Sequence, residues 1–302
     1  VFVGVYRSCG CREGNENGGV VMNLDDYLTI VIPVKNEERN LPDCLASIRS
    51  FRHVVLVDSG SEDRTQEIFH EYAHDDWIGV DFRWDGRFPK KRNWILRNFS
   101  FKTPWVMFLD ADERITPGFV DELEKFLSSH ESRHYDVIRC QFDNWFCGRM
   151  LNHGDTVQKT AIVRVGSAEY EKIDEDRWSK LDMEIHEHIQ TKRADAEYVI
   201  KARLEHHDYR SLESHWQKHL EYAKWEAGRY WQLKAHPDRW VALTKRQRIK
   251  YSLITSRLMA VGYAAYSYVV KCGFMDGIAG FRFAKFKFHY FRFVRRRILE
   301  AK

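Results

Sequence analysis

The sequence predicts an α/β fold, with a mostly parallel sheet flanked by helices and a helical C-terminal extension. Strand-like and helix-like segments alternate between residues 28 and 130, which is typical of a parallel sheet with right-handed crossovers. The run Trp105–Leu109 is continuously apolar, as in a strand that is covered on both faces. From Ser211 onward, apolar residues recur at spacings of three and four, which favours helices.

The first predicted strand, Leu28–Val34, is rich in β-branched residues and leads into a polar loop. Asn40 is expected to cap the helix that follows this loop. The second predicted strand is Val54–Val57, and Ser61 or Asp63 starts the next helix. Because parallel strands present their carboxyl ends at one edge of a sheet, the polar residues after these two strands should lie close together.

Ile78–Trp84 alternates in polarity and is predicted to be the third strand, and Lys90–Phe99 is predicted to be a short helix. Thr116 followed by Pro117 marks a helix start after the apolar run at Trp105–Leu109. After about residue 135 the alternation gives way to longer polar segments. Further strands are predicted at residues 135–142 and 161–165.

We divide the chain into an N-terminal extension (1–27), a main domain (28–210) and a helical, basic-aromatic C-terminal region (211–302). The extension is rich in Gly, Asn and Glu and is expected to be flexible, with Met22 as the native start; an ordinary N-terminal arm is the alternative. The six cysteines are sparse and irregularly spaced, so reduced thiols and a cytoplasmic location are predicted. No stretch approaches the roughly 18 apolar residues of a membrane span.

Basic residues concentrate near the C-terminus and alternate there with phenylalanines, although the net charge is only +4 and argues against a general nucleic-acid binder. This composition is typical of a segment that faces anionic lipid, so a peripheral position at the inner face of the cell membrane is predicted. The alternatives are a helix that packs its rings on the protein, stacking on single-stranded nucleic acid, and a strand at residues 281–288. The residues concerned are Phe281, Phe283, Phe286, Phe288, Phe291, Phe293, Arg282, Lys285, Lys287, Arg292 and Arg295 to Arg297.

Two carboxylates, Asp110 and Asp112, follow the apolar strand directly. Because like charges held this close repel each other, a hard divalent cation such as Mg2+ or Mn2+ would stabilise them and keep positions open for phosphate oxygens. The alternative is a solvated Asp-x-Asp turn that caps the next helix. Ligands of open α/β sheets bind at the carboxyl ends of strands, which favours the metal hypothesis.

Asp58 ends the second strand, where its carboxylate could accept the N–H of a base such as uracil; an Asx-turn before Gly60 is the alternative. Lys91 and Arg92 open a predicted helix, and the helix dipole favours anions there rather than cations. A bound anion such as a diphosphate would explain these two basic residues. A solvated basic turn is the alternative.

Glu187 lies between two histidines in Ile185–Ile189, where a carboxylate could act as a general base. If this segment is a strand, both imidazoles share the face opposite Glu187 and could bind a metal; an exposed strand edge is the alternative. Asp155 and Glu184 are the next candidates for the base. The residues His206 to Asp208 could supply a further metal ligand or simply end a strand.

Four motifs follow one another in a characteristic order and spacing. They are Thr29–Glu38, Val55–Thr65, Lys91–Asn93 and Phe108–Glu113. With these motifs the sequence resembles the family-two inverting glycosyltransferases of the GT-A fold, strongly over residues 28–130 and more weakly through Glu187 and His206. Lys271–Phe281 resembles the Gly-Phe-Leu-Asp-Gly segment of a bacterial subgroup that adds sugars, often glucose, to lipopolysaccharide core or exopolysaccharide precursors.

This resemblance implies a role for each matching position, with a UDP-sugar as donor and Mn2+ or Mg2+ as cofactor. The implied nucleotide-site residues are Pro33, Lys35 and Glu37, together with Asp58 at the nucleobase, Lys91 or Arg92 near the phosphates, and Asp110 on the ribose or metal side. Asp112 is implied to bind the metal. Glu187 is implied to be the catalytic general base. The sequence departs from the family in lacking the usual Glu-Asp pair for the base and in carrying Lys159–Arg164 where an Arg-Leu segment is usual.

The resemblance implies a metal-dependent inverting transferase that acts on a lipopolysaccharide-core or exopolysaccharide-type acceptor. One alternative is a catalytically silent nucleotide- or sugar-binding protein on the same fold. Another is a nucleotidyltransferase, which would need a Gly-rich phosphate loop after the first strand, whereas Val34–Asn40 contains no glycine. A membrane- or nucleic-acid-binding module with idle carboxylates is a third alternative.

Overall fold

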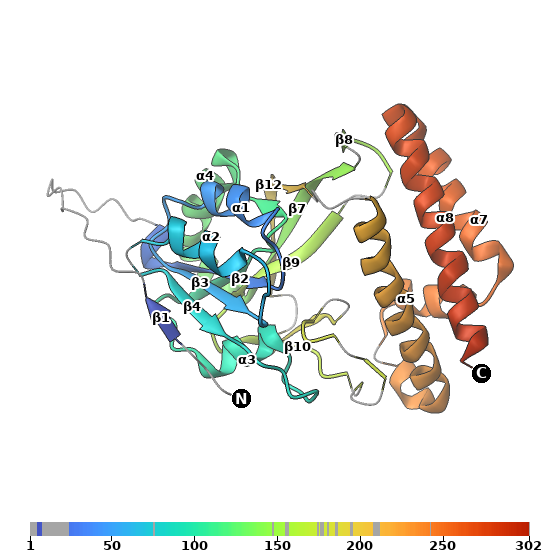
Figure 1. The fold of residues 1–302 in the computed structure, drawn as a ribbon, viewed down its shortest axis with the longest axis horizontal. Coiled ribbons are helices and arrows are strands. Elements are labelled where there is room, and N and C mark those ends of the chain that lie inside the picture. The colour runs from blue at the N-terminus through green and yellow to red at the C-terminus, as the bar shows by residue number, and fades with distance from the viewer. Residues whose placement is uncertain are drawn as a thin grey trace, which may run out of the picture. The chain divides into compact units, whose positions relative to one another are not determined.

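The structure is a computed structural model, and it forms two compact units (Figure 1). The residues that it describes are 5–7, 24–74, 76–146, 148–154, 157–173, 175, 178–179, 181–184, 187–193, 196–207, 212–241 and 243–301. Unit 1 comprises Val1–Asp143, Val157–Ile173 and Leu181–Tyr209. Unit 2 comprises Asn144–Thr156, Asp174–Lys180 and Arg210–Lys302.

A mixed sheet runs through unit 1, with four parallel strands at its centre in the order β4-β3-β2-β5. These strands are β2 (Leu28–Val34), β3 (Val54–Asp58), β4 (Ile78–Asp81) and β5 (Trp105–Phe108). Antiparallel strands continue the sheet on both sides, with β1 next to β4 and the order β9-β7-β12-β6 beyond β5. They are β1 (Val5–Arg7), β6 (Glu113–Arg114), β7 (Val137–Phe146), β9 (Val157–Arg164) and β12 (Glu197–His207).

Helices cover both faces of this sheet, which explains why its central strands are apolar throughout. Ile30 and Ile32 face a core with α1 (Leu41–Ser47), α2 (Thr65–Tyr72) and α4 (Pro117–Leu127). Val31 between them faces a second core, which contains Ile95 of α3 (Lys91–Asn98). Figure 1 shows α1, α2 and α4 on one side of the sheet and α3 on the other. The α/β prediction is therefore confirmed.

Short elements complete unit 1. They are the 3-10 helices η1 (Leu24–Asp26) and η2 (His130–His134) and the two-stranded sheet of β10 (Ala168–Tyr170) and β11 (Ile189–Thr191). Part of the predicted N-terminal extension, β1, pairs with β4, and the remaining residues before Leu24 lie outside the described part of the chain.

One of the two predicted helix caps is confirmed. The Thr116 side chain accepts a hydrogen bond from the Phe119 amide at the start of α4. Asn40 occupies the N-cap position of α1 as predicted, but its side chain makes no capping hydrogen bond; its amide nitrogen donates to the Glu37 carboxylate at 2.8 Å.

An ion pair at the start of β7 gives a pH-dependent contribution to stability. Asp136 is buried and accepts two hydrogen bonds from the Arg193 guanidinium, which lowers the pKa of Asp136. A lowered pKa means that this stabilisation is present above the ordinary carboxyl pKa of about 4 and is lost as the pH falls through the native value.

We expect Asp136→Asn to lower the melting temperature at pH 7 and to flatten its dependence on pH below 4. Scanning calorimetry between pH 2.5 and 7 measures both effects. Asp121→Asn, at an exposed position of α4, is the matched control and should reproduce the wild-type profile. A wild-type slope in Asp136→Asn would contradict the assignment.

Unit 2 is mainly helical, as predicted for the C-terminal region. Its elements are β8 (Arg149–Leu151), α5 (Leu212–Ala235), η3 (Pro237–Trp240), α6 (Lys245–Leu253), α7 (Arg257–Ala265), the π-helical turn η4 (Tyr266–Val270), the 3-10 turn η5 (Gly273–Asp276) and α8 (Gly277–Glu300). The strand alternative for residues 281–288 is wrong, because Phe283, Ala284 and Phe291 are buried at helical spacing on one side of α8. Among the described residues, no helix is both long and apolar enough to cross a bilayer.

Candidate active site

Three carboxylates gather where β5 ends. Asp110, Asp112 and Glu113 share a tight turn in which the Glu113 amide donates to the Asp110 carbonyl and the Asp110 amide donates to the Glu113 carboxylate, both at 2.9 Å. Asp112 and Glu113 are buried. Burial, opposed by Lys159 and reinforced by the two aspartates, raises the pKa of Glu113 to about 7. The turn therefore concentrates negative charge at the carboxyl edge of the sheet.

Two cations from other elements face this turn. Lys159 of β9 places its Nζ 2.8 Å from Asp110 Oδ2 and 2.6 Å from Glu113 Oε1. Arg92 of α3 places Nη2 2.6 Å from Asp110 Oδ1. Since each Asp110 oxygen accepts a hydrogen bond from a protein cation, a metal ion would have to compete for it.

Asp112 faces an imidazole. Its Oδ2 lies 3.6 Å from His206 Nε2, and its carbonyl accepts from the His207 amide. Pairing of β12 with β6 sets His206 opposite Glu113 in the register. Burial works against protonation of His206, but the charges of Asp112 and Glu113 outweigh it and raise the pKa of His206.

A carboxylate and an imidazole are a donor set that suits Mn2+ and tolerates Mg2+. No group of three or more His, Cys, Asp or Glu side chains in the described residues could hold a metal by itself. A metal at Asp112 and His206 would therefore take its remaining ligands from water and phosphate oxygens, as Mg2+ commonly does in nucleotide sites. The residues therefore fit the predicted cofactor. Since β12 ends at His207, the alternative that this segment ends a strand is observed, and the role of His206 as a metal ligand stays a prediction.

The basic residues at the start of α3 are balanced by carboxylates of the protein. Glu184 caps the helix, because its two oxygens accept from the Arg92 amide at 2.9 Å and the Asn93 amide at 3.0 Å. Lys91 donates its backbone amide to the Asp182 carbonyl, and its Nζ lies 3.5 Å from an Asp182 oxygen. Sequence reasoning predicted an anion at this helix start but missed Glu184, since no short-range signal links residues so far apart.

The Arg92 guanidinium is held by hydrogen bonds from both terminal nitrogens and by two aromatic rings. Its Nη1 donates to the Glu184 carbonyl at 2.7 Å, and its guanidinium lies over the rings of Phe108 and Tyr170. Burial disfavours the charge, but the neighbouring Asp110 reverses the effect and raises the pKa of Arg92. This cation is therefore fixed at the end of β5.

The predicted nucleotide-site residues share the same edge of the sheet. Val34 and Asp58 are paired in the register of β2 and β3, so buried Pro33 and exposed Lys35 lie next to the end of β3. Lys91 reaches this edge, where its Nζ donates to the Val34 carbonyl at 2.9 Å.

Asp58 is fully buried and already has partners. Its carboxylate accepts from the Ser61 hydroxyl and from the Gln66 amide, both at 2.6 Å, and from the Ser61 backbone amide. The turn alternative is therefore observed, and the contact with a base stays a prediction. Glu37 accepts from Asn40 and donates its backbone amide to Thr65 Oγ1, which fixes the loop after β2.

Glu187 is buried, and its Oε1 lies 2.7 Å from the Nζ of Lys90. Glu187 and His188 lie just before β11 rather than in it, and the His188 amide donates to a Glu171 oxygen. His186 and Asp155 lie outside the described residues. Glu184 is a poor alternative base, since both of its oxygens cap α3.

The structure thus brings Asp110, Asp112, Arg92 and His206 together and adds two residues that the sequence analysis did not select. Lys159 was noted only as a departure from the family, because the predicted strand began too late, at residue 161, to include it; Glu113 was absent from the predicted site. The polar pattern of Gln158, Lys159 and Thr160 just before an apolar run was the signal that could have found Lys159.

The mostly parallel sheet with an acidic turn at its carboxyl edge is the arrangement of a GT-A-type glycosyltransferase. The family model "Glycosyl transferase family 2" matches residues 29–201. The chain belongs to this family.

Several curated relatives are similar over a little more than a third of the chain, as two of them illustrate. The lipopolysaccharide core biosynthesis glycosyltransferase LpsC of Rhizobium meliloti is 30% identical over 106 residues, covering 34% of this chain and 38% of LpsC. An undecaprenyl-phosphate 4-deoxy-4-formamido-L-arabinose transferase of Pseudomonas paraeruginosa is 34% identical over 127 residues, covering 39% of this chain and 36% of the relative. This chain therefore spans well under half of the length of either relative.

Solved structures that this chain matches include residues 1–349 of TarS from S. aureus. TarS is 16% identical, with a TM-score of 0.44, over 91% of this chain and 92% of the TarS chain. Glucosyl-3-phosphoglycerate synthase from Mycobacterium tuberculosis, in complex with Mn2+, UDP and its product, is 20% identical, with a TM-score of 0.32, over 43% of this chain and 50% of the synthase chain.

Proposed function

We propose that this glycosyltransferase is metal-dependent and inverting, and that it transfers a sugar, glucose in the first instance, from a UDP-sugar to a lipopolysaccharide-core or exopolysaccharide-type acceptor. The observation that carries the proposal is the Asp112–His206 pair at the carboxyl end of β5, beside Asp110 and the fixed cation of Arg92. This arrangement supplies metal ligands and positive charge at one edge of the sheet, as a nucleoside diphosphate requires.

In this proposal the donor lies along the carboxyl ends of β2, β3 and β5. Asp58 accepts the N–H of the base, and Lys91 and Arg92 face the phosphates. Asp110 orients Arg92 and contacts the ribose or metal side. Pro33, Lys35 and Glu37 line the nucleotide site. A Mn2+ or Mg2+ ion held by Asp112 and His206 would neutralise charge on the departing diphosphate.

Glu187 takes the proton from the acceptor hydroxyl. The hydroxyl oxygen attacks the anomeric carbon on the face opposite UDP, and the bond between that carbon and the UDP oxygen breaks in the same displacement. The anomeric centre is inverted as a result. The buried Lys90, whose Nζ lies 2.7 Å from Glu187 Oε1, orients the Glu187 carboxylate.

The acceptor class rests on the relatives and on the C-terminal resemblance. LpsC is named as a lipopolysaccharide core enzyme, and the Pseudomonas relative is named for undecaprenyl phosphate. Both names describe membrane-linked saccharide chemistry. A cytoplasmic site of action at the inner face of the membrane remains our prediction.

The proposal is tested by thermal shift with a panel of nucleotide sugars and Mn2+, followed by UDP release with lipopolysaccharide-core acceptors. A UDP-sugar at 100 times its Kd should stabilise the protein by about 2.7 kcal/mol, and the acceptor should trigger UDP release. UDP binding without release in the presence of acceptor extracts would favour a nucleotide-binding role instead. Equal shifts with and without Mn2+ would refute metal dependence.

Asp112→Asn is expected to remove the Mn2+-dependent part of UDP binding while preserving the fold. The amide loses the charge that a divalent cation needs, whereas its size is unchanged. Titration calorimetry with UDP and Mn2+ measures the loss, and Asp121→Asn is the control at an exposed site. Unchanged affinity in Asp112→Asn would show that the acidic turn holds no metal.

A further inference from the structure

The hairpin formed by α7, η4, η5 and the start of α8 exposes a ridge of large apolar side chains. Seven of them lie within Tyr266–Phe281, each with between 44% and 70% of its surface exposed. They are Tyr266, Val269, Val270, Phe274, Met275, Ile278 and Phe281. Scattered exposed apolar residues are ordinary, but a concentration of this kind marks an interaction surface.

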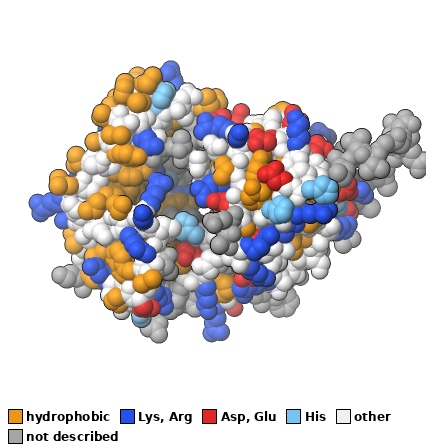
Figure 2. Space-filling model, turned by 180° about the vertical axis from the view of Figure 1, so that it is seen from behind, with side chains coloured by type: hydrophobic (Ala, Val, Ile, Leu, Met, Phe, Trp, Pro, Cys, Tyr) orange, Lys and Arg blue, Asp and Glu red, His pale blue; other side chains and the backbone are white. Residues whose placement is uncertain are grey.

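These side chains form one surface, which we call the apolar ridge. The ring of Tyr268 lies 6.3 Å from that of Phe274 and 6.1 Å from that of Phe281. Tyr268 therefore connects η4 with both η5 and α8. Figure 2 shows hydrophobic side chains, with Lys and Arg among them, over the part of the surface that the C-terminal helices form.

The ridge sits on a tightly built turn. A Cβ at Gly280 would collide with the Gly273 carbonyl, and one at Gly273 would lie 2.8 Å from the Ser267 carbonyl oxygen. The Asp276 carboxylate accepts from the backbone amides of Asn152 and His153. The Gly-Phe-Met-Asp-Gly motif is thus explained: its polar and small residues fix the turn, and its apolar residues are left at the surface.

The charge around the ridge is almost entirely positive. Residues 241–299 contain 13 Lys and Arg and a single acidic residue, Asp276. The Asp276 side chain is only 4% exposed. No carboxylate from this stretch therefore offsets the cations at its surface, and a partner that carries negative charge is complementary to it.

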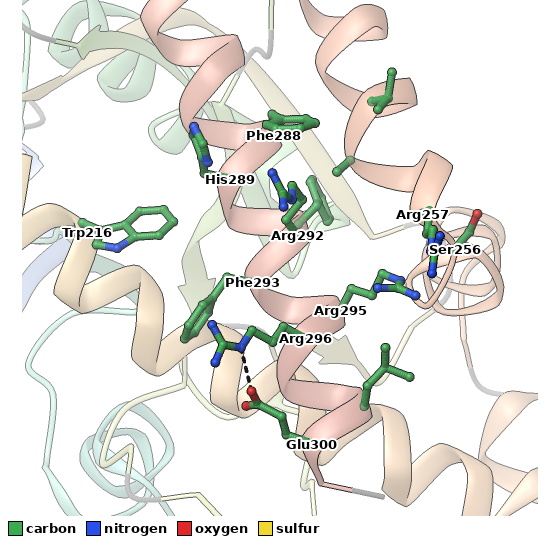
Figure 3. Close-up of a pocket in the computed structure, with 14 residues that line it drawn as sticks. Trp216, Ser256, Arg257, Phe288, His289, Arg292, Phe293, Arg295, Arg296 and Glu300 are labelled. Carbon is green, nitrogen blue, oxygen red and sulfur yellow. Dashed lines mark hydrogen bonds and ion pairs between the residues drawn. The ribbon is translucent and has the colours of Figure 1, made fainter.

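A basic pocket of about 830 Å³ lies in the same unit, against α8 (Figure 3). Arg257 of α7 and Arg292, Arg295 and Arg296 of α8 line it together with Phe288 and Glu300. Glu300 pairs with Arg296 at 2.6 Å, which leaves the pocket with a surplus of positive charge. Figure 3 shows Arg295 extending from α8 toward Arg257 and Ser256. Guanidinium groups bind phosphate oxygens in bidentate geometry, so the pocket suits a phosphate-bearing headgroup.

Most of the C-terminal phenylalanines do not belong to the ridge. Phe283 and Phe291 are buried, and Phe146 and Tyr263 contact their rings. Phe283 and Phe291 therefore pack on the protein, which was the alternative considered for these rings. The exposed apolar surface lies mostly before residue 281, whereas the sequence composition pointed to the basic-aromatic segment that begins at Phe281.

We propose that unit 2 docks on an anionic lipid bilayer, with the apolar ridge in the headgroup–acyl boundary and the pocket arginines on lipid phosphates. A bilayer matches both features, because it offers an apolar interior beneath an anionic surface. The inference does not depend on the proposed donor or acceptor, since the ridge and the pocket lie in unit 2 and the candidate active-site residues lie in unit 1.

The test is sedimentation of the full chain with vesicles of phosphatidylglycerol and phosphatidylethanolamine at low salt, with phosphatidylcholine vesicles as the uncharged comparison. We expect the wild type to pellet with the anionic vesicles only. The double variant Met275→Glu, Ile278→Glu should bind at least about tenfold more weakly, because it sets charge against the acyl region. The matched control Val241→Glu, Ile249→Glu changes two equally exposed apolar residues outside the ridge and should bind like the wild type.

A second variant tests the pocket. Arg257→Gln with Arg292→Gln should weaken binding to anionic vesicles by about 25-fold, since each cation near such a surface contributes about fivefold. UDP affinity, measured in parallel, should be unchanged in every variant. Wild-type pelleting by the ridge variant would overturn the proposal. A wild-type dimer that the ridge variant converts to a monomer would also overturn it, because the ridge would then bind a second copy of the chain.

Discussion

Glu187→Gln is expected to slow sugar transfer by about 10²–10⁴-fold while UDP affinity stays at the wild-type value. The amide can still accept a hydrogen bond from Lys90, 2.7 Å from Oε1, but it cannot take a proton from the acceptor. Single-turnover transfer with a radiolabelled UDP-sugar measures the rate, and calorimetry measures UDP affinity. Retained transfer would move the base to another residue.

Stability has to be followed in the same experiment, because the substitution leaves a buried lysine without its carboxylate partner at Glu187. The rate is therefore compared at a temperature at which both proteins are folded. Glu169→Gln is the control, because Glu169 pairs with Arg97 at an exposed site on β10 and has no part in the proposed reaction. It should transfer sugar at the wild-type rate.

Lys159→Met is expected to lower the free energy of unfolding by about 3–5 kcal/mol, because it leaves the buried Glu113 without its cation. Urea denaturation followed by fluorescence measures the change. Lys102→Met is the control: its partner Asp76 lies at the surface and the lysine side chain is 62% exposed, so its loss should cost less than about 1 kcal/mol.

A double-mutant cycle identifies the cause. If the unpaired carboxylate is responsible, adding Glu113→Gln to Lys159→Met should restore a large part of the lost stability. Equal losses in Lys159→Met with and without Glu113→Gln would assign the effect to the packing of the lysine stem instead.

Local patterns predicted the elements and the position of the acidic turn. The runs at β2, β3 and β5 are apolar because both faces are covered, and their short length and β-branched or aromatic content identify them as strands. Asp110 and Asp112 were found because they directly follow such a run. Apolar residues at spacings of three and four predicted the C-terminal helices, including α8.

What the sequence could not show are the partners brought in from distant segments. Glu184 caps α3 from 92 positions away, and Lys159 reaches Asp110 from 49 positions away. No periodicity or capping rule spans such distances, because only the folded sheet makes these residues neighbours. Asn40 makes no side-chain capping bond for a local reason: its backbone is already helical, and Pro42, two residues later, has no N–H to donate.

Three successive residues at the start of α3 are each tied to the segment before β11: Lys90 to Glu187, Lys91 to Asp182 and Arg92 to Glu184. Two chain segments joined at three consecutive points move as one part. If Glu187 is the base and Lys91 and Arg92 face the donor phosphates, as proposed, a shift of Glu187 toward an acceptor would displace these two cations. Binding of the diphosphate and the position of the base would then depend on each other.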